Sequence, residues 1–326
     1  MTDGSEQGPA AGFVERTSCP VCGAPGGTVL RECRYDSQPV KGFLDRFYSR
    51  QGGVEHEWLR GAAYVVRECR ECGLVFQQSA PAGELARRLY EHWIDPDKAY
   101  EVFERHRRVD YFFPPLREIA DVIDFLGGQP AELTFLDFGS GWGHWARLAR
   151  GFGCAVLAAD LAPSRSAATG QHGIGVLSPD ELGAERFDYI NAEQVFEHLP
   201  RPAETLRSLA RSLRPGGLIL VSVPDGGDIR RRLQDWDWDA PEGSRRSLIA
   251  VAPLEHVNCF SHGTLVKLGE VAGLEEAEVP SRYYVGTLPG PLRAAAEGSR
   301  RALRRARALL GLRGGTRVFL RRRKAG

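Results

Sequence analysis

The residues 134–145, TFLDFGSGWGHW, combine a short apolar run, an acid at its end and three closely spaced glycines. Gly139, Gly141 and Gly143 leave backbone N–H groups free to approach a ligand at the start of the helix expected to follow. The GxGxxG pattern of dinucleotide-binding loops does not fit, because its third glycine is missing here. The carboxylate of Asp137 would repel a pyrophosphate and attract a cation such as an ammonium group.

A second acid, Asp160, ends the next apolar run, CAVLAAD, about twenty residues beyond the first glycine. At the end of a second parallel strand, a carboxylate can accept hydrogen bonds from both hydroxyls of a ribose. The ligand that these residues suit therefore has a ribose and a cationic amino group, and it lacks a pyrophosphate. S-adenosylmethionine meets all three conditions, so we expect Asp137, the glycines and Asp160 to bind it. The alternative is that the glycines only form a tight turn.

The surrounding pattern predicts the elements that hold these residues. From Leu133 onward, short apolar runs alternate with helix-length segments, which predicts βαβ units and a parallel sheet with helices on both faces. Residues 274–287 are expected to add one more hairpin to this sheet. Upstream, residues 81–128 have helical periodicity and end in a glycine pair that stops a helix.

Three motifs occur in order, DFGSGWG, FDYINAEQVFEHLPRP and LRPGGLILVSVPD, and they resemble those of the class I S-adenosylmethionine-dependent methyltransferases. The resemblance covers roughly residues 131–287, about half of the chain. It implies a Rossmann-like α/β fold whose seven-stranded sheet is flanked by helices, and an enzyme that transfers a methyl group from S-adenosylmethionine. It also implies cofactor contacts from the glycine loop and from the ends of the second and fourth strands: Gly139, Ser140, Gly141, Gly143, Asp160, Leu161, Ala192 and Gln194.

A hydroxyl or carbon acid that accepts a methyl group needs a base to take its proton, and histidine is suited to neutral pH. Two of the eight histidines have a chemical context. His256, in LEHVNCFSHGTL, is our first choice for this base, and His198, in VFEHLP just past the expected fourth strand, is the second. A structural hydrogen bond and metal ligation stay open for His256, and packing of its loop stays open for His198.

The stretches FDYINAEQVFEH and EHVNCFS also resemble ubiquinone-pathway O-methyltransferases, a subgroup that holds a divalent ion with two Glu and one His. Glu197 and His198 match that pattern, but Gln194 stands where the pattern has its first Glu. Because an amide is a poorer ligand than a carboxylate, the sequence argues against a metal ion here.

Two CxxC pairs, CPVCG and CRECG, precede the glycine loop and contain Cys19, Cys22, Cys69 and Cys72. In a reducing compartment such pairs are more often metal ligands than disulfides. Four thiolates form a closed tetrahedral zinc site, which stabilises a small domain and leaves no position for catalysis. A redox or disulfide pair is the alternative. The remaining cysteines, Cys33, Cys154 and Cys259, are expected to be buried or spectators.

The formal net charge of +1 hides an uneven distribution, because residues 291–326 carry twelve Arg or Lys and one Glu. A solvated tail, contact with an anionic membrane surface and binding of nucleic acid are its three interpretations, in that order. The chain has no secretory signal and no apolar run long enough to span a membrane, so we expect a cytoplasmic protein.

These features predict five segments: a disordered 1–18, a zinc-ribbon domain at 19–78, a helical lid or linker at 79–128, a class I methyltransferase domain at 129–290 and a basic tail at 291–326. A zinc ribbon ahead of such a domain resembles enzymes that methylate sugar nucleotides and other secondary metabolites. We therefore expect a small-molecule acceptor, methylated at a hydroxyl or carbon. An RNA methyltransferase that grips phosphates with zinc ribbon and tail, and a non-catalytic scaffold that binds the cofactor, are the other two hypotheses.

Overall fold

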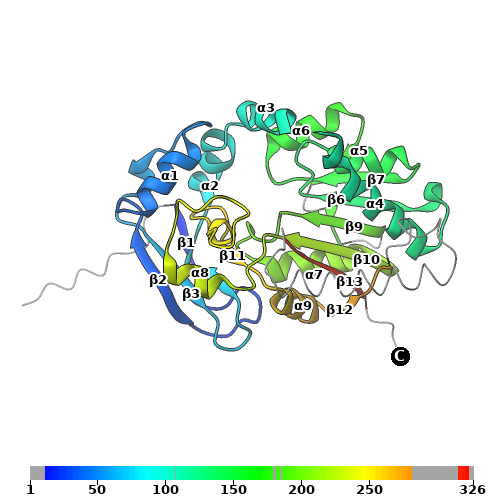
Figure 1. The fold of residues 1–326 in the computed structure, drawn as a ribbon. Helices are drawn as coiled ribbons and strands as arrows, with labels where there is room; N and C mark the ends of the chain where they lie inside the picture. The colour runs from blue at the N-terminus through cyan, green and yellow to red at the C-terminus, as the bar shows by residue number, and fades with distance from the viewer. Residues whose placement is uncertain (1–11, 107, 179–180, 184–185, 281–314, 323–326) are drawn as a thin grey trace, which may run out of the picture. The chain divides into compact units, whose positions relative to one another are not determined.

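The computed structural model describes residues 12–106, 108–178, 181–183, 186–280 and 315–322. The chain divides into two compact units (Figure 1). We call the first the cysteine unit; it comprises Met1–Arg105, Glu197–Pro202 and Gly226–Thr264. We call the second the Rossmann-like unit; it comprises His106–Phe196, Ala203–Asp225 and Leu265–Gly326.

The Rossmann-like unit is built on a seven-stranded sheet in the order β12-β13-β10-β9-β6-β7-β8. Neighbours from β10 to β8 are parallel, and β13 runs antiparallel to both β10 and β12. This confirms the predicted α/β class with a seven-stranded methyltransferase sheet. The strands are β6 (Thr134–Phe138), β7 (Ala155–Ala159), β8 (Gly175–Val176), β9 (Phe187–Glu193), β10 (Leu213–Val223), β12 (Leu274–Ala277) and β13 (Thr316–Arg322).

Helices pack on both faces of this sheet. On one face the ring of Trp145 in α5 lies 5.8 Å from that of Tyr189 in β9. On the other face α9 approaches β13 so closely that a Cβ added to Gly269 would lie 2.6 Å from Leu320. The helices belonging wholly or mostly to this unit are α4 (Val109–Leu126), η3 (Pro130–Glu132), α5 (His144–Gly151), α6 (Pro163–Gln171), α7 (Pro202–Ser212) and α9 (His262–Val271). The predicted glycine stop is confirmed at the end of α4, where Gly127 is left-handed with φ 74°.

The closing strand of the sheet differs from the sequence expectation. β12 lies within the 274–287 segment, but the strand it pairs with is β13, from the segment expected to be a basic tail. Val318 and Leu320 alternate with Arg and Phe in TRVFLRR, so one side of β13 buries two aliphatic side chains, each 1% exposed. Because the segment is rich in arginine, its sequence was interpreted as a basic tail and not as a strand. The rest of the predicted tail, residues 291–314 and 323–326, lies outside the described residues.

The cysteine unit contains a four-stranded antiparallel sheet in the order β11-β4-β3-β2 and a two-stranded sheet of β1 and β5. Its strands are β1 (Phe13–Glu15), β2 (Thr28–Arg34), β3 (Ala63–Glu68), β4 (Val75–Gln77), β5 (Ser79–Pro81) and β11 (Asn258–Cys259). Its helices are α1 (Val40–Tyr48), η1 (His56–Leu59), α2 (Gly83–Arg88), the π-helical η2 (Leu89–Trp93), α3 (Pro96–His106, which ends just past the unit), α8 (Ile229–Asp235) and η5 (Ile249–Val251).

Several expected boundaries change in this unit, which also includes residues 79–105 of the expected lid or linker and residues 197–202 of the expected methyltransferase domain. Residues 226–264, predicted to be part of the methyltransferase domain, belong here because β11 adds to the edge of β4 and Trp238 joins the same core as Phe43, with ring centroids 4.6 Å apart. Phe13–Glu15 form β1, so ordered structure begins inside the segment expected to be disordered. Such long-range pairings are not visible in local sequence periodicity.

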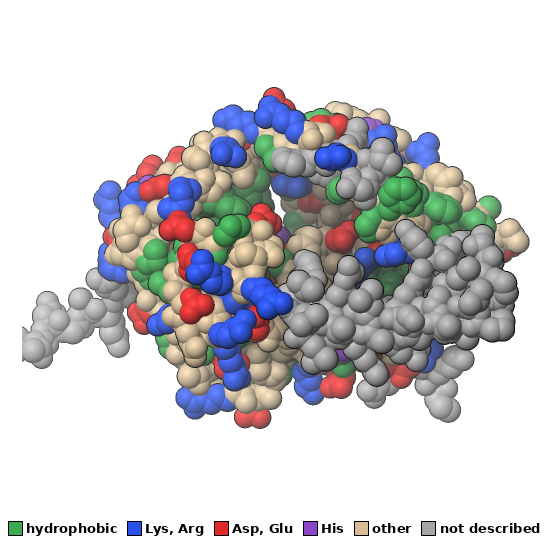
Figure 2. Space-filling view, viewed as in Figure 1, with side chains coloured by type: hydrophobic (Ala, Val, Ile, Leu, Met, Phe, Trp, Pro, Cys, Tyr) green, Lys and Arg blue, Asp and Glu red, His purple; other side chains and the backbone are tan. Residues whose placement is uncertain are grey.

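Basic and acidic side chains are interspersed over the face of the cysteine unit shown in Figure 2. Several arginines of the cysteine unit are paired with acids of the same unit, among them Arg46 with Asp239, Arg230 with Glu68 and Arg246 with Asp237. In the part of the chain described, no helix is long and apolar enough to cross a bilayer.

Candidate active site

The glycine loop joins β6 to α5, and all three of its glycines have left-handed backbone conformations. The φ angles of Gly139, Gly141 and Gly143 are 79°, 53° and 72°, which residues with a Cβ rarely adopt. The Gly139 N–H donates to the carbonyl of Ala159 at 2.7 Å, and a Cβ at this glycine would lie 2.2 Å from Cγ2 of Val195. The loop is therefore held tightly between β7 and the segment that follows β9.

Asp160 lies directly beside this loop. Its Oδ2 accepts the Gly141 N–H at 2.8 Å, and its Oδ1 accepts the Ala162 N–H at 2.9 Å. The next residue, Leu161, is 64% exposed. The two sequence signals, glycines and acid, are thus brought together at the carboxyl ends of β6 and β7.

Asp137 has a different environment from the one its charge suggested. It is 2% exposed, and its carboxylate accepts hydrogen bonds from the backbone N–H of Ala146 at 3.2 Å and from Nδ2 of Asn191 at 3.0 Å. Burial raises its pKa to about 7, although both hydrogen bonds oppose this. These contacts indicate that Asp137 holds the start of α5 against β9. Because the glycine loop leads into α5, Asp137 also helps to fix the position of the loop.

The other predicted cofactor residues also lie around the loop. The hydroxyl of Ser140 is 3.2 Å from that of Thr169 in α6, so it connects the loop to that helix. Ala192 is buried near the end of β9. Gln194 follows this strand with a left-handed φ of 55°, and its N–H donates to the carbonyl of Ser222 at 2.7 Å.

Three further charged residues, which sequence reasoning did not assign to the cofactor, lie near this part of the sheet. Glu193 and Arg317 both align with Ser222 across β9, β10 and β13, so they share one face of the sheet. Arg317 forms an ion pair with the buried Glu118 of α4, whose other oxygen accepts from the hydroxyl of Tyr189 at 2.8 Å. The exposed Glu193 and the partly exposed Arg317 offer opposite charges at the carboxyl end of the strands. Without β13 in the sheet, no sequence signal placed Arg317 here.

The two predicted histidines belong to the cysteine unit and lie against each other, with ring centroids 4.9 Å apart. One oxygen of Glu197 and one nitrogen of each ring lie within 4.8 Å of one another. Nδ1 of His198 lies 3.1 Å from the carbonyl of Glu255, and Nδ1 of His256 is bonded to the carbonyl of Ile249. A carbonyl only accepts, so each Nδ1 donates a proton, and in the neutral form of either ring Nε2 is the acceptor.

The difference in burial between the two rings changes the order of the two candidate bases. Burial lowers the pKa of His256 to about 4, so His256 is neutral near pH 7 but is a weak proton acceptor. The side chain of His198 is 24% exposed and is therefore more accessible to an acceptor. A group formed by two imidazoles and one carboxylate can hold a shared proton, and it also suits a divalent cation.

Replacement of His256 by asparagine is expected to change how stability depends on pH. The folded-state pKa lies below the usual 6.5, so the stability that neutral His256 contributes is present above that value and is lost as pH falls towards about 4. Between about pH 7.5 and 4.5 the wild type should lose roughly 2–3 kcal/mol more than His256→Asn. Urea unfolding of both proteins measures this. The opposite contribution of Asp137 is common to both and cancels, so parallel pH profiles would contradict the expectation.

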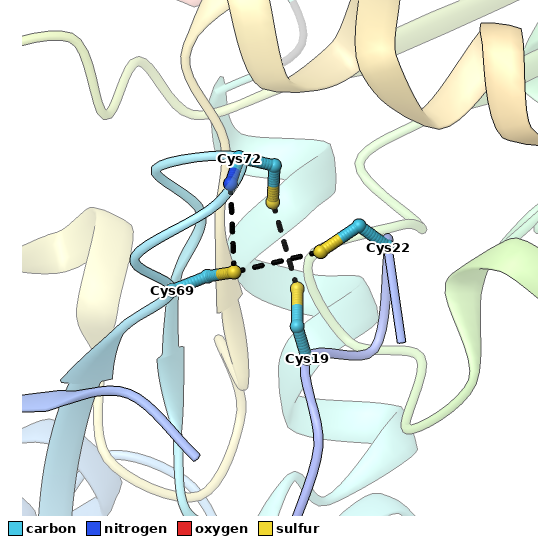
Figure 3. Close-up of side chains that lie close together, drawn as sticks. All are labelled: Cys19, Cys22, Cys69 and Cys72. Carbon is cyan, nitrogen blue, oxygen red and sulfur yellow. Dashed lines mark hydrogen bonds between the residues drawn. The ribbon is translucent and has the colours of Figure 1, made fainter. Parts of the chain in front are cut away.

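The four cysteines of the two pairs converge in the cysteine unit (Figure 3). Sγ of Cys19 is 3.6 Å from that of Cys72, and Sγ of Cys22 is 3.5 Å from that of Cys69. Sulfurs around a tetrahedral zinc are about 3.8 Å apart, given Zn–S bonds of about 2.3 Å. Hydrogen bonding from Cys72 lowers the pKa of Cys19 to about 5, so one thiolate is already favoured. The residues present therefore fit a zinc site with four cysteine ligands.

A family model described as a methyltransferase domain matches residues 103–279, more than half of the chain. The chain therefore belongs to this family, and with its strand order it is a member of the class I S-adenosylmethionine-dependent methyltransferases.

Curated relatives carry the name ubiquinone biosynthesis O-methyltransferase. The protein of that name from Xanthomonas oryzae pv. oryzae (strain PXO99A) is 34% identical over 146 residues, covering 40% of this chain and 61% of the relative. The one from Parvibaculum lavamentivorans is 28% identical over 161 residues, covering 45% of this chain and 64% of the relative. The chain thus spans less than two thirds of the length of these relatives. A solved S-adenosylmethionine-dependent methyltransferase from Mesorhizobium loti is 18% identical, with a TM-score of 0.40, covering 61% of this chain and 95% of that one.

Proposed function

We propose that this protein is an enzyme that transfers the methyl group of S-adenosylmethionine to a small-molecule acceptor. The observation that supports the proposal is the hydrogen bond from the Gly141 N–H to Asp160, because a carboxylate beside such a glycine loop suits the two hydroxyls of a ribose. The opposite charges of Glu193 and Arg317 on one face suit the ammonium and carboxylate of the methionine end.

The sulfonium already activates the methyl group, so the enzyme mainly has to hold the acceptor in line and exclude water. Positioning of this kind contributes roughly 7–11 kcal/mol. The acceptor that we favour is a hydroxyl or an acidic carbon, because both need a base and a neutral histidine such as His198 can act as one. Neutral His256 and the carboxylate of Glu197 then stabilise the proton that His198 takes up. The name O-methyltransferase of the curated relatives supports a hydroxyl.

We also propose that Cys19, Cys22, Cys69 and Cys72 hold one structural zinc ion. The support is the spacing of the four sulfurs, which together fill a tetrahedral shell and leave no position for an exchangeable ligand. An RNA acceptor is the weaker proposal, because several arginines of the cysteine unit are neutralised by acids and offer little positive potential to phosphates.

Isothermal calorimetry with S-adenosylhomocysteine tests the cofactor assignment. Asp160→Asn should bind this ligand about 10- to 100-fold more weakly than the wild type, since it loses charge-assisted hydrogen bonds to the ribose. Asp188→Asn is the matched control: this acid pairs with Arg214 in the same unit but belongs to the amino end of β9. It should lose stability and keep its affinity. If the wild type binds a nicotinamide or flavin nucleotide and does not bind S-adenosylhomocysteine, the proposal is refuted.

A further inference from the structure

Arg16 is a buried cation whose guanidinium bridges separate segments of the cysteine unit. It is 8% exposed and lies over the ring of Phe76, 5.3 Å from the centroid. Nε and Nη2 donate to the carbonyl of Gln77, with the Nε bond at 3.0 Å. Nη1 donates to Oδ1 of Asn258 at 2.7 Å, and Nη2 donates to the carbonyl of Val257 at 2.5 Å. One planar group therefore holds β4 and the segment of β11 together.

Two partners of Arg16, Asn258 and Gln77, also hydrogen-bond to the backbone of the segments that carry the histidines. Asn258 donates from Nδ2 to the carbonyl of Leu199 at 2.7 Å and from its backbone N–H to the carbonyl of Glu197 at 3.0 Å. These two carbonyls flank His198 along the chain. Gln77 donates from Nε2 to the carbonyl of His256 at 3.0 Å. Each histidine is thus held through the backbone of its own segment by a partner of Arg16.

The segments that contain Arg16 and Gln77 also lead into the cysteine pairs. Arg16 precedes Cys19 by three residues, and Gln77 follows Cys72 by five. The backbone N–H of Arg16 donates to the carbonyl of Gln78 at 2.7 Å, which joins the segment before Cys19 to the segment after Cys72. An ion that fixes Cys19 relative to Cys72 therefore also fixes Arg16 relative to Gln77.

We propose that Arg16 is a positioning residue that couples the four-cysteine site to the histidine pair. When a metal ion fills the cysteine site, the guanidinium sets the spacing of the segments that carry His198 and His256. The catalytic part of this inference rests on the proposed function, whereas the structural coupling does not. Lysine cannot replace Arg16, because a single ammonium cannot serve three acceptors in one plane.

The test uses Arg16→Met and Arg16→Lys in the full chain, with Arg67→Met as the matched control. Arg67 also lies beside the cysteine pairs and donates to Oε1 of Gln78 at 2.6 Å and to the carbonyl of Gly27 at 3.1 Å, and neither of these two partners belongs to a histidine segment. Zinc content and the charge-transfer band of the cobalt-substituted protein report on the cysteine site. The ¹H and ¹⁵N signals of the imidazole Nδ1–H groups report on His198 and His256.

Both Arg16 variants should retain one metal ion per chain while the imidazole Nδ1–H signals shift or disappear. Their kcat should fall about tenfold to a hundredfold with the KM for S-adenosylmethionine unchanged. Removing the metal from the wild type should move the same imidazole signals, and in Arg16→Lys this response should be lost. Arg67→Met should keep metal, signals and kcat.

Unchanged imidazole signals in an Arg16 variant that holds its metal would overturn the proposal, and so would loss of the metal together with the signals in both variants. If the wild type neither binds S-adenosylhomocysteine nor turns over, the proposed function fails, but the metal and imidazole measurements still decide the coupling.

Discussion

Gly139→Ala is expected to abolish binding of S-adenosylhomocysteine. The new methyl group would lie 2.2 Å from Cγ2 of Val195, and the φ of 79° at this position is itself unfavourable for alanine. Relief of the overlap must move either the loop or the residues that follow β9, and both carry predicted cofactor contacts. We expect at least a 100-fold loss of affinity, about 2.7 kcal/mol, and an unfolding free energy lower by roughly 2–4 kcal/mol.

Gly151→Ala is the control for this substitution. Gly151 ends α5, has no positive φ, and an added Cβ would meet nothing within 4 Å. Alanine there should leave the affinity unchanged and raise stability by up to about 1 kcal/mol. Calorimetry and urea unfolding measure both quantities. Wild-type affinity in Gly139→Ala would show that the ligand does not depend on this loop.

Cys19→Ser is expected to remove the metal ion and destabilise the cysteine unit. A site with three thiolates binds zinc much more weakly, and the free energy of metal binding is also free energy of folding, on the order of several kcal/mol or more. The wild type should contain one zinc per chain, and the variant should contain less than a tenth of that. The melting temperature should fall by more than about 10 °C, because this loss exceeds the effect of most point mutations.

The matched control is Cys33→Ser. Cys33 is half-buried on β2, and its thiol lies 3.4 Å from its neighbour's backbone carbonyl, away from the four converging sulfurs. A hydroxyl can make the same contact, so zinc content and melting temperature should stay close to wild type. Zinc retained in full by Cys19→Ser, or equal loss in both variants, would contradict the assignment of the four cysteines.

Local sequence predicted much of the backbone geometry of the candidate cofactor site. Gly139, Gly141 and Gly143 each have positive φ, a property of the residue itself that can be inferred from its type. Asp160 follows a strand whose apolar run is continuous, so its place at a strand end follows from the pattern. The short spacing within each CxxC pair likewise fixes how two thiols of one pair can converge. The class of fold was predictable for the same reason, since alternating strand and helix patterns allow few topologies.

The tertiary structure alone decided which distant segments meet. β13 lies between β10 and β12. Leu320 in this strand packs against α9 at Gly269, about fifty residues earlier in the chain. Asp137 turned inward because Ala146 and Asn191 supply donors there, which its charge could not reveal. Arg16, Gln77 and Asn258 hydrogen-bond to one another or to the segments that carry the two histidines. The local sequence around these three residues does not indicate a site. Sequence patterns reflect the conformational preferences of residues that are close together in the chain. The arrangements described here depend instead on burial and hydrogen bonding between residues far apart in the chain.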